Sequence, residues 1–471
     1  MAIILETQLL EGLEKAVQKA NELNTSVLFS KVIKVQALSP LSFYTAGREQ
    51  FLGERLFWQE PMNGTAETAI VGLGRVEKVQ THADNHRYSN IEKEWQGLLD
   101  HSVIQCEKEI PMTGPILFGA FSFDCNKSQS LLWDHFGDNF FYVPRYMISN
   151  LNGETYFTTN ILCAPGEDIK RYTTIFEIGE QLWQASLNDV SFDENVLMEK
   201  KEVEPKHWKH QVAEAVKTLK SSDIDKIVLA RELRLTYQQT ISSDAILAHL
   251  LEEQASSYIY SLESASDCFI GATPERLVKK EKNNVLSTCL AGSIARGKTE
   301  AEDQALGTQL LTDPKNLIEH QYVVKMITNV LQLLCKELNV PHSPVLMKIK
   351  HIQHLFTPVT AICNDDISIF RFVKELHPTP ALGGLPQEEA VEWIRENESL
   401  ERGLYGGPIG WIDAYGNGEF AVALRNALLQ GKEASLFAGC GIVEDSNPED
   451  EYQETWIKFK PMLNALGGDL S

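Results

Sequence analysis

The spacing of hydrophobic residues predicts that strands dominate the first half of the chain. Residues 6–23 place apolar side chains on one helical face and charged side chains on the other, which predicts an amphipathic helix. Asn152 and Gly153 separate two apolar runs and tolerate positive φ, so they predict a hairpin turn. Short β-rich runs occupy residues 26–35, 51–58, 69–79, 116–123 and 142–148.

The second half mixes helices with strands. A polar, acidic stretch at 186–205 predicts a linker or exposed segment, and an amphipathic helix around 208–219 follows it. The aliphatic run that begins at Lys226 predicts a short buried strand. Further predicted elements are strands around 257–271 and 285–291, a helix near 315–338 capped by Asp313 and Pro314, and a hairpin at Gly416 to Gly418.

Strands in hairpins with interspersed helices differ from a regular alternation of strand and helix. This pattern predicts an α+β fold with large antiparallel β-sheets packed with helices. We divide the chain into a strand-rich half at 1–200 and a second region at 206–465.

Composition excludes some partners. The chain has 471 residues and a net charge of −22, and no stretch is rich in basic and aromatic residues together, so we expect no nucleic acid. An anionic substrate would need a metal ion or local Lys and Arg. The eight cysteines form no C-x-x-C pair, and no run approaches the ~18 apolar residues of a membrane helix. We expect a soluble, cytoplasmic protein with reduced thiols and no membrane contact.

Lys226 is an unusual residue to find at the start of a buried strand. Its aliphatic stem could extend along the strand and leave the ammonium group in water. Alternatively, the buried lysine could give up its proton and act as a base. The strand alone leaves both interpretations open.

Glu275 follows an apolar strand and Pro274, so its carboxylate points into a site or into solvent. Taken alone, it fits an ordinary loop glutamate. Because Lys226 and Glu275 both lie where a strand meets a turn, they could face each other as base and acid.

Three other glutamates are candidate metal ligands. Glu319 shares a helical face with Val323 and Ile327, and a carboxylate on an apolar face needs a partner or a metal. Glu451 and Glu454 lie on one face of a helix that Asn447 and Pro448 begin. An acidic first turn also complements the helix dipole, but Glu454 lies beyond that turn. Oxygen ligands from two helices favour Mg²⁺ over Zn²⁺.

Weaker candidates have ordinary explanations. His351 and His354 could pair on a metal, but this spacing beside apolar residues is more typical of hydrogen-bonded core histidines. Arg425 ends a strand and could bind a carboxylate or lie at a sheet edge. The run 437–442 contains two glycines but lacks the setting of a dinucleotide loop, which disfavours nicotinamide binding.

Several motifs together resemble the chorismate-utilising enzymes, and most closely their isochorismate synthase branch of the menaquinone-pathway type. They lie between about 206 and 465, while the first half matches more loosely at 55–58 and 118–121. The resemblance implies one α+β unit with a deep central site. The motifs are Lys226 to Arg231, Gly271 to Arg276, Leu290 to Ser293, Asp313 to His320, His377 to Gly384, Arg402 to Gly407 and Phe437 to Lys458.

The resemblance also implies chemistry. Lys226 would activate water to attack C2 of chorismate, and Glu275 would protonate the departing C4 hydroxyl. Glu319 and Glu454 match direct Mg²⁺ ligands, and Glu451 matches a nearby or water-mediated one. Arg425, Lys458 and the backbone of Gly292, Gly439 and Gly441 match groups that hold the two carboxylates, while Leu290, His354, Thr379, Ala381, Leu382 and Tyr405 match pocket residues.

A few positions distinguish the branches. Ammonia-using relatives such as anthranilate synthase component I carry glutamine where this chain has Lys226, so we expect no glutaminase subunit. Aminodeoxychorismate synthase has a nucleophilic lysine where Ala291 stands. Ala381 is a small apolar residue where lyases tend to place a hydroxyl, which favours an isomerase.

Four alternatives stay open. A siderophore-pathway isochorismate synthase would share the reaction, and a salicylate synthase would differ only in its product. A chorismate-binding subunit without activity is disfavoured by the intact Lys226 and Glu275. A Mg²⁺-dependent phosphoryl-transfer enzyme is disfavoured because the chain has no glycine loop for phosphates.

Overall fold

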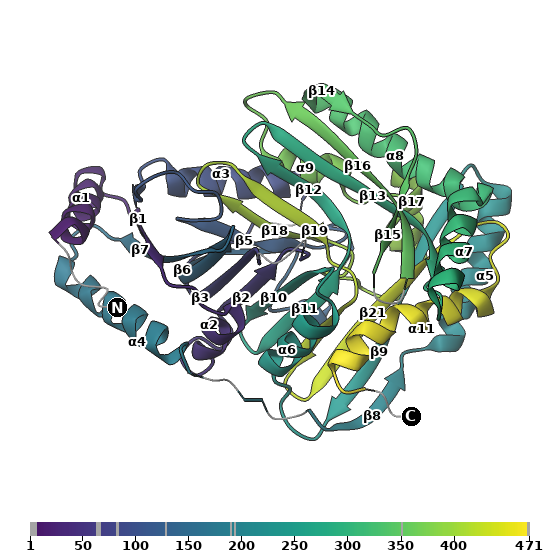
Figure 1. The fold of residues 1–471 in the computed structure, drawn as a ribbon, viewed down its shortest axis with the longest axis horizontal. Coiled ribbons are helices and arrows are strands. Elements are labelled where there is room, and N and C mark those ends of the chain that lie inside the picture. Colours follow the sequence, from purple (N-terminus) through teal and green to yellow (C-terminus); the bar gives the residue numbers. More distant parts are fainter. Residues whose placement is uncertain are drawn as a thin grey trace.

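The fold is α+β, as predicted, with long antiparallel strands and helices on the outside (Figure 1). The computed structural model describes residues 7–62, 67–81, 84–127, 130–188, 191–192, 195–349 and 352–468. The helices in these ranges are α1 (Thr7–Leu23), α2 (Pro40–Ala46), α3 (Arg87–Leu99), α4 (Thr173–Ala185), α5 (Pro205–Ser221), α6 (Ser243–Glu253), α7 (Glu300–Thr312), α8 (Pro314–Leu334), α9 (Ile369–Leu376), α10 (Gln387–Asn397) and α11 (Pro448–Ala465).

The strands of the first half are β1 (Val27–Val35), β2 (Arg55–Gln59), β3 (Ala69–Val79), β4 (Val103–Gln105), β5 (Ile116–Phe121), β6 (Asn139–Leu151), β7 (Glu154–Cys163) and β8 (Leu197–Glu202). Those of the second half are β9 (Lys226–Tyr237), β10 (Tyr258–Ser264), β11 (Asp267–Thr273), β12 (Arg276–Glu281), β13 (Asn284–Ala295), β14 (Cys335–Asn339), β15 (Val345–Lys348), β16 (Ile352–Cys363), β17 (Gly384–Leu385), β18 (Pro408–Asp413), β19 (Gly418–Val422), β20 (Asn426–Gln430) and β21 (Glu433–Ile442).

Strands from the two halves pair with each other. β2 pairs antiparallel with β10, and β5 pairs antiparallel with β18. The division near residue 200 stays a prediction, but hydrogen-bonded pairing continues across it. In Figure 1, α1 and α4 lie at one end of the molecule, and α5, α7, α8 and α11 lie at the other.

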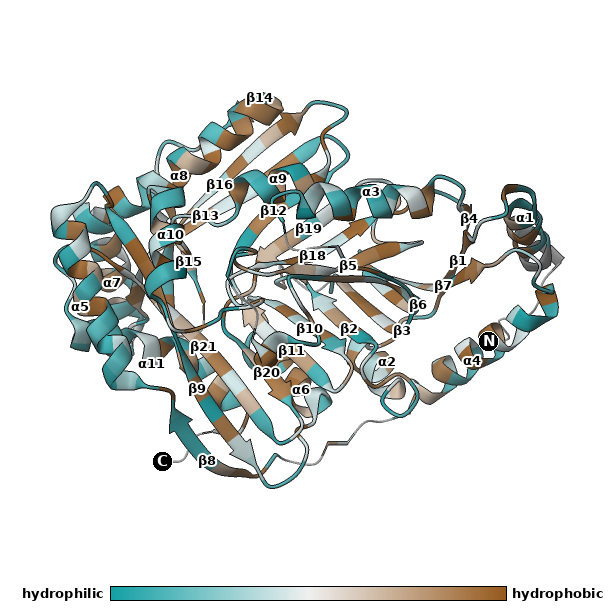
Figure 2. Cartoon of the chain, turned by 180° about the vertical axis from the view of Figure 1, so that it is seen from behind, coloured by the Kyte–Doolittle hydropathy of each residue, from teal (hydrophilic) through white to brown (hydrophobic). Residues whose placement is uncertain are grey.

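Hydrophobic residues of the strands form the core. Figure 2 shows long hydrophobic stretches on the central strands, whereas α3 on the outside is largely hydrophilic. In the largest cluster, Val323 and Ile327 of α8 and Phe370 of α9 pack with Val278 and Cys289 of the sheet. This packing fixes α8, which carries Glu319, against the strands. No helix in the described part of the chain is long and apolar enough to span a membrane.

Local turn signals were accurate, but one longer prediction was wrong. Asn152 and Gly153 both adopt positive φ in the β6–β7 hairpin, and Gly416 does so between β18 and β19. The predicted helix near 315–338 instead ends at Leu334, because residues 335–339 pair with β16 as β14. The predicted linker or exposed segment at 186–205 contains β8, which is largely exposed although it pairs with β9.

Candidate active site

Lys226 begins β9 and lies between two other strands. Leu385 of β17 pairs with it, and Ile442 of β21 pairs with the next residue. The lysine is only 7% exposed, and its Nζ donates a hydrogen bond to Glu319 Oε1 at 2.5 Å. The ammonium group therefore does not extend into open water; it forms an ion pair with a carboxylate of α8.

Two glycines make room for Lys226. A Cβ at Gly441 would lie 2.5 Å from Lys226 Cε and 3.1 Å from its Nζ. Gly384 has φ of +134°, and a Cβ there would lie 2.1 Å from the Lys226 carbonyl oxygen. Both glycines are needed for close approach, one beside the lysine side chain and one beside its backbone.

Glu275 lies in the turn between β11 and β12 and is 7% exposed. Its carbonyl oxygen accepts a hydrogen bond from Val422 N at 2.9 Å, which anchors the turn to β19. Burial raises the pKa of its carboxyl to about 7, although the positive charges of Lys226 and Arg425 and the Thr379 hydroxyl oppose the shift. A carboxyl with this pKa can hold a proton near neutral pH and release it.

Two further cations approach the same carboxyl. Arg425 has a left-handed backbone with φ of 47°, and burial lowers the pKa of its guanidinium to about 10. Lys458 of α11 donates to Gly439 O at 2.8 Å and forms a 2.7 Å ion pair with Glu454. Burial disfavours the Lys458 ammonium, but Glu454 and Cys440 together offset this, so the pKa of Lys458 is raised.

His354 is a buried neutral histidine with one unused nitrogen. Its Nδ1 lies 3.1 Å from Ser293 Oγ, whereas its Nε2 is buried and has no hydrogen-bond partner. Burial, reinforced by the charges of Arg425 and Lys458, lowers its pKa to about 3. A buried polar atom without a partner is unfavourable, so Nε2 is suited to a ligand.

The remaining predicted pocket residues lie on three segments. Leu290 and Gly292 are on β13, where a bulge between Leu290 and Ser293 gives Gly292 a φ of +81°. Tyr405 stacks on Phe437 with ring centroids 5.6 Å apart. A Cβ at Gly439 would lie 3.1 Å from the Tyr405 hydroxyl.

The turn before β17 carries the last three predicted residues. Leu382 N donates to Thr379 O at 2.9 Å, and Leu382 is buried. Ala381, between them, is partly exposed. Val228 N donates to Gly383 O at 3.1 Å, which attaches this turn to the strand of Lys226.

The three predicted metal ligands are all glutamates with oxygen donor atoms. In this structure each of them contacts another side chain: two contact lysines and one contacts a serine. Glu319 accepts from Lys226, Glu454 pairs with Lys458, and Glu451 accepts from Ser446. Among the described residues, no group of three or more His, Cys, Asp or Glu is arranged to hold a metal ion. Lys458 nevertheless interacts with two of these glutamates. It forms an ion pair with Glu454, and its positive charge helps Lys226 to lower the pKa of Glu319. The donor chemistry fits Mg²⁺ if the two lysines give up these partners.

His351, the other residue considered for a metal, lies outside the described ranges.

Sequence patterns did not identify two buried charged residues near this site. Glu398 and Arg402 form an ion pair and contact the backbone of β9. Arg402 begins one of the recognised motifs, so its position was noticed, but its partners are distant in sequence. All eight cysteines are unpaired, as expected.

The chain is similar to known proteins over nearly its whole length. It is 43% identical over 461 residues to isochorismate synthase MenF of Bacillus subtilis, covering 96% of each chain. It is 33% identical over 467 residues to the salicylate biosynthesis isochorismate synthase of Pseudomonas aeruginosa, covering 97% of this chain and 94% of the relative.

Solved structures show the same fold. The menaquinone-specific isochorismate synthase MenF of Escherichia coli matches with a TM-score of 0.76 at 22% identity, covering 97% of this chain and 99% of that one. Anthranilate synthase component I of Streptococcus pneumoniae matches with a TM-score of 0.69 at 21% identity, covering 85% and 93%. Residues 15–467 match the family described as chorismate binding enzyme. The protein therefore belongs to the chorismate binding enzyme family.

Proposed function

We propose that this protein is an isochorismate synthase, an isomerase that converts chorismate to isochorismate. Water adds at C2 of the ring, the C4 hydroxyl leaves, and the ring double bonds shift between these positions. The observation that carries the proposal is a buried lysine, Lys226, whose charge acts on a second buried group, the Glu275 carboxyl, while burial raises the pKa of that carboxyl to about 7. The similarity to relatives named isochorismate synthase supports it.

Each proton transfer has a candidate group. Lys226, in its neutral form, takes a proton from the attacking water. Glu275 delivers a proton to the leaving hydroxyl, for which a pKa of about 7 is suitable. One proton is removed and one is supplied, so the isomerisation is balanced.

Charged groups of the site bind the two carboxylates of chorismate. Arg425 and Lys458 supply positive charge, and His354 Nε2 is a hydrogen-bonding atom without a protein partner. These groups are needed because the protein has a net charge of −22 and repels anions at long range. The backbone at Gly292, Gly439 and Gly441 lets the substrate approach closely.

Mg²⁺ is the proposed cofactor, held by Glu319 and Glu454 with Glu451 nearby. When bound, it supplies positive charge that neutralises the ring carboxylate. With these carboxylates on the metal, Lys226 and Lys458 would be free to contact water and substrate. We propose no glutaminase subunit, because Lys226 serves water rather than ammonia.

The proposed pathway is menaquinone biosynthesis in the cytoplasm. The relative from Bacillus subtilis is named MenF, and similarity to it extends over 96% of both chains. The unpaired cysteines agree with a reducing compartment. The salicylate biosynthesis relative keeps an alternative pathway open, but its name also describes an isochorismate synthase.

A product assay tests the function. Purified protein with chorismate and Mg²⁺, without ammonia, should give isochorismate as the main product on chromatography, and EDTA should abolish turnover. Salicylate and pyruvate as main products would contradict the isomerase assignment. Turnover that is unchanged by EDTA, and equal in a Glu454→Ala variant, would contradict the metal assignment.

A further inference from the structure

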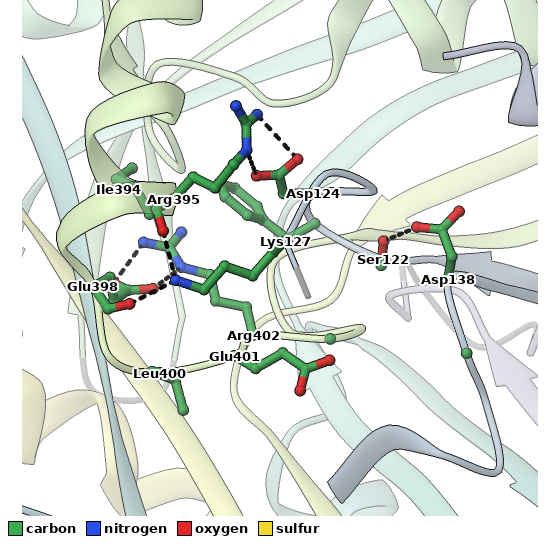
Figure 3. A pocket seen from close by; sticks show the side chains of 13 residues that line it. Ser122, Asp124, Lys127, Asp138, Ile394, Arg395, Glu398, Leu400, Glu401 and Arg402 are labelled. Carbon is green, nitrogen blue, oxygen red and sulfur yellow. Dashed lines mark hydrogen bonds and ion pairs between the residues drawn. The ribbon is translucent and has the colours of Figure 1, made fainter. Parts of the chain in front are cut away.

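Arg402 and Glu398 form a buried ion pair beside the strand that carries Lys226. Arg402 Nε lies 2.7 Å from Glu398 Oε1, and its second terminal nitrogen lies 2.9 Å from Glu398 Oε2. The two side chains are 5% and 1% exposed. Figure 3 shows the pair at the end of α10, with Lys127 beside it. A two-point contact of this kind fixes both side chains in one orientation.

The pair is also hydrogen-bonded to the backbone of two site segments. Arg402 donates to Val228 O at 2.7 Å and to Leu382 O at 3.1 Å. Glu398 Oε2 accepts from Ala230 N at 2.7 Å. One ion pair thus joins β9 to the turn that contains Thr379 and Leu382.

These contacts fill a gap at the edge of β9. One edge of the strand pairs with β21 along almost its whole length. On the other edge, β17 pairs only with Lys226 and Ile227, and β8 pairs from Leu233 onward. Val228 and Ala230 lie in the gap and are buried, so their backbone groups need partners. Arg402 and Glu398 take the place of the missing strand.

The segment that contains Phe123 and Lys127, from the first half of the chain, packs against the Arg402–Glu398 pair. Lys127 Nζ donates to the carbonyl oxygens of Glu398 and Arg395, at 2.8 and 2.7 Å. The Arg402 guanidinium lies 4.2 Å from the centre of the Phe123 ring. The cavity between these side chains has a volume of only about 20 Å³. That is room for about one water molecule, so the pair is not itself a ligand site.

We propose that Arg402 and Glu398 are positioning residues for the isomerisation. They touch neither substrate nor metal, but they set where Lys226 lies relative to the turn at Thr379 to Leu382. The inference rests on the proposed function, because that function assigns the base to Lys226. Loosening the pair moves the base and the pocket wall apart.

The test compares Arg402→Met and Glu398→Gln with a control, Arg395→Met. Arg395 also forms a two-point ion pair near the end of α10, but its guanidinium donates to Asp124 rather than to the backbone of β9. For the two test variants, we expect kcat per folded molecule to fall by about 100-fold and KM for chorismate to rise, since displacement of about 1 Å has such effects. The control should keep kcat and KM within about twofold.

A second measurement separates positioning from general stability. Hydrogen exchange at the Ala230 amide should become faster in Arg402→Met and Glu398→Gln than in the control, at equal fractions of folded protein. An Arg402→Lys variant keeps the charge but has only three N–H donors for the four oxygens that Arg402 contacts, so its kcat should fall between those of the wild type and Arg402→Met. If Arg402→Met does not fold, the nearly isosteric Glu398→Gln variant decides the question.

Variants that lose yield but keep kcat and KM per folded molecule would overturn the positioning role. Unchanged exchange at Ala230 would overturn it as well. A wild-type protein that makes a different product from chorismate would contradict the proposed function alone. The exchange data and the rate of that product would then still decide the role of the pair.

Discussion

Two buried clusters of charged residues in this protein differ in how fully their members are paired. In the first, Arg55 contacts Glu263 at 2.7 and 3.0 Å and Asp244 at 3.0 Å, and Tyr44 donates to Glu263 at 2.9 Å. The Arg55 guanidinium also lies 4.2 Å from the centre of the Tyr44 ring. In the second cluster, at the candidate active site, His354 Nε2 has no partner and Glu275 has a raised pKa.

The difference indicates different uses of buried charge. A cluster that supplies its own partners is satisfied without a ligand, and its charges hold α2, α6, β2 and β10 together. A cluster that leaves a nitrogen unpaired and a carboxyl with a raised pKa is suited to bind a ligand. Removing a charge from the Arg55 cluster should therefore reduce stability, whereas removing one from the site should reduce turnover.

The largest expected effect is on turnover, in Lys226→Ala. The variant should lose about 10²- to 10⁴-fold in kcat, which is the usual contribution of a general base, and should still bind chorismate. Steady-state kinetics and calorimetric binding would measure the two effects. Near-normal turnover would show that Lys226 is not the general base. It would also contradict the proposed difference between the site and the Arg55 cluster.

The second effect is on stability, in Arg55→Met. Without Arg55, the Glu263 and Asp244 carboxylates are buried without their main cation, so unfolding free energy should fall by about 3–5 kcal/mol. Denaturant unfolding would measure the loss, and kcat per folded molecule should not change. Arg48→Met is the matched control, because Arg48 also pairs with Asp244 but is 42% exposed. It should cost under about 1 kcal/mol.

The third effect depends on pH. The folded pKa of Glu275 is about 7, above its unfolded value, so the folded state holds this proton more tightly. Its stabilising contribution is complete below about pH 4.5 and is lost as pH rises through about 7, a change of about 3 kcal/mol. Relative to Glu275→Gln, the wild type should therefore be less stable at pH 8 than at pH 5. If the wild type and Glu275→Gln differ by the same unfolding free energy at both pH values, the pKa of Glu275 is not raised in the folded protein.

The smallest effect tests the space around the base. Gly441→Ala places a methyl group 2.5 Å from Lys226 Cε, and the lysine must move. We expect kcat to fall by about tenfold with little loss of stability, because displacing the proposed base slightly has effects up to about 100-fold. Gly97→Ala on α3, where a Cβ would meet nothing within 4 Å, is the control and should leave kcat unchanged. Equal activity in both would mean that Lys226 tolerates displacement.

Features set by neighbouring residues could be predicted from the sequence. The strand at Lys226, the hairpin at Asn152 and Gly153 and the start of α8 depend on local propensity and capping, and all three were confirmed. The helix end near 338 was wrong because pairing with β16 outweighs local preference.

Features set by distant residues could not be predicted in this way. The Lys226 to Glu319 contact joins positions 93 apart, and the Arg402 to Val228 contact joins positions 174 apart. Hydrophobic periodicity does not encode such pairs. The motif resemblance grouped Lys226 and Glu319 in one site, but it assigned no partner to Arg402.

The backbone of Arg425 has an evolutionary consequence. A left-handed conformation at a residue with a Cβ is unfavourable by about 1–2 kcal/mol, and glycine would relieve it. Selection for stability alone would therefore tend to replace this arginine. Its presence there marks a position where stability has been traded for a cation at a fixed place, and attempts to make the protein more heat-resistant by consensus or glycine substitutions should leave Arg425 untouched.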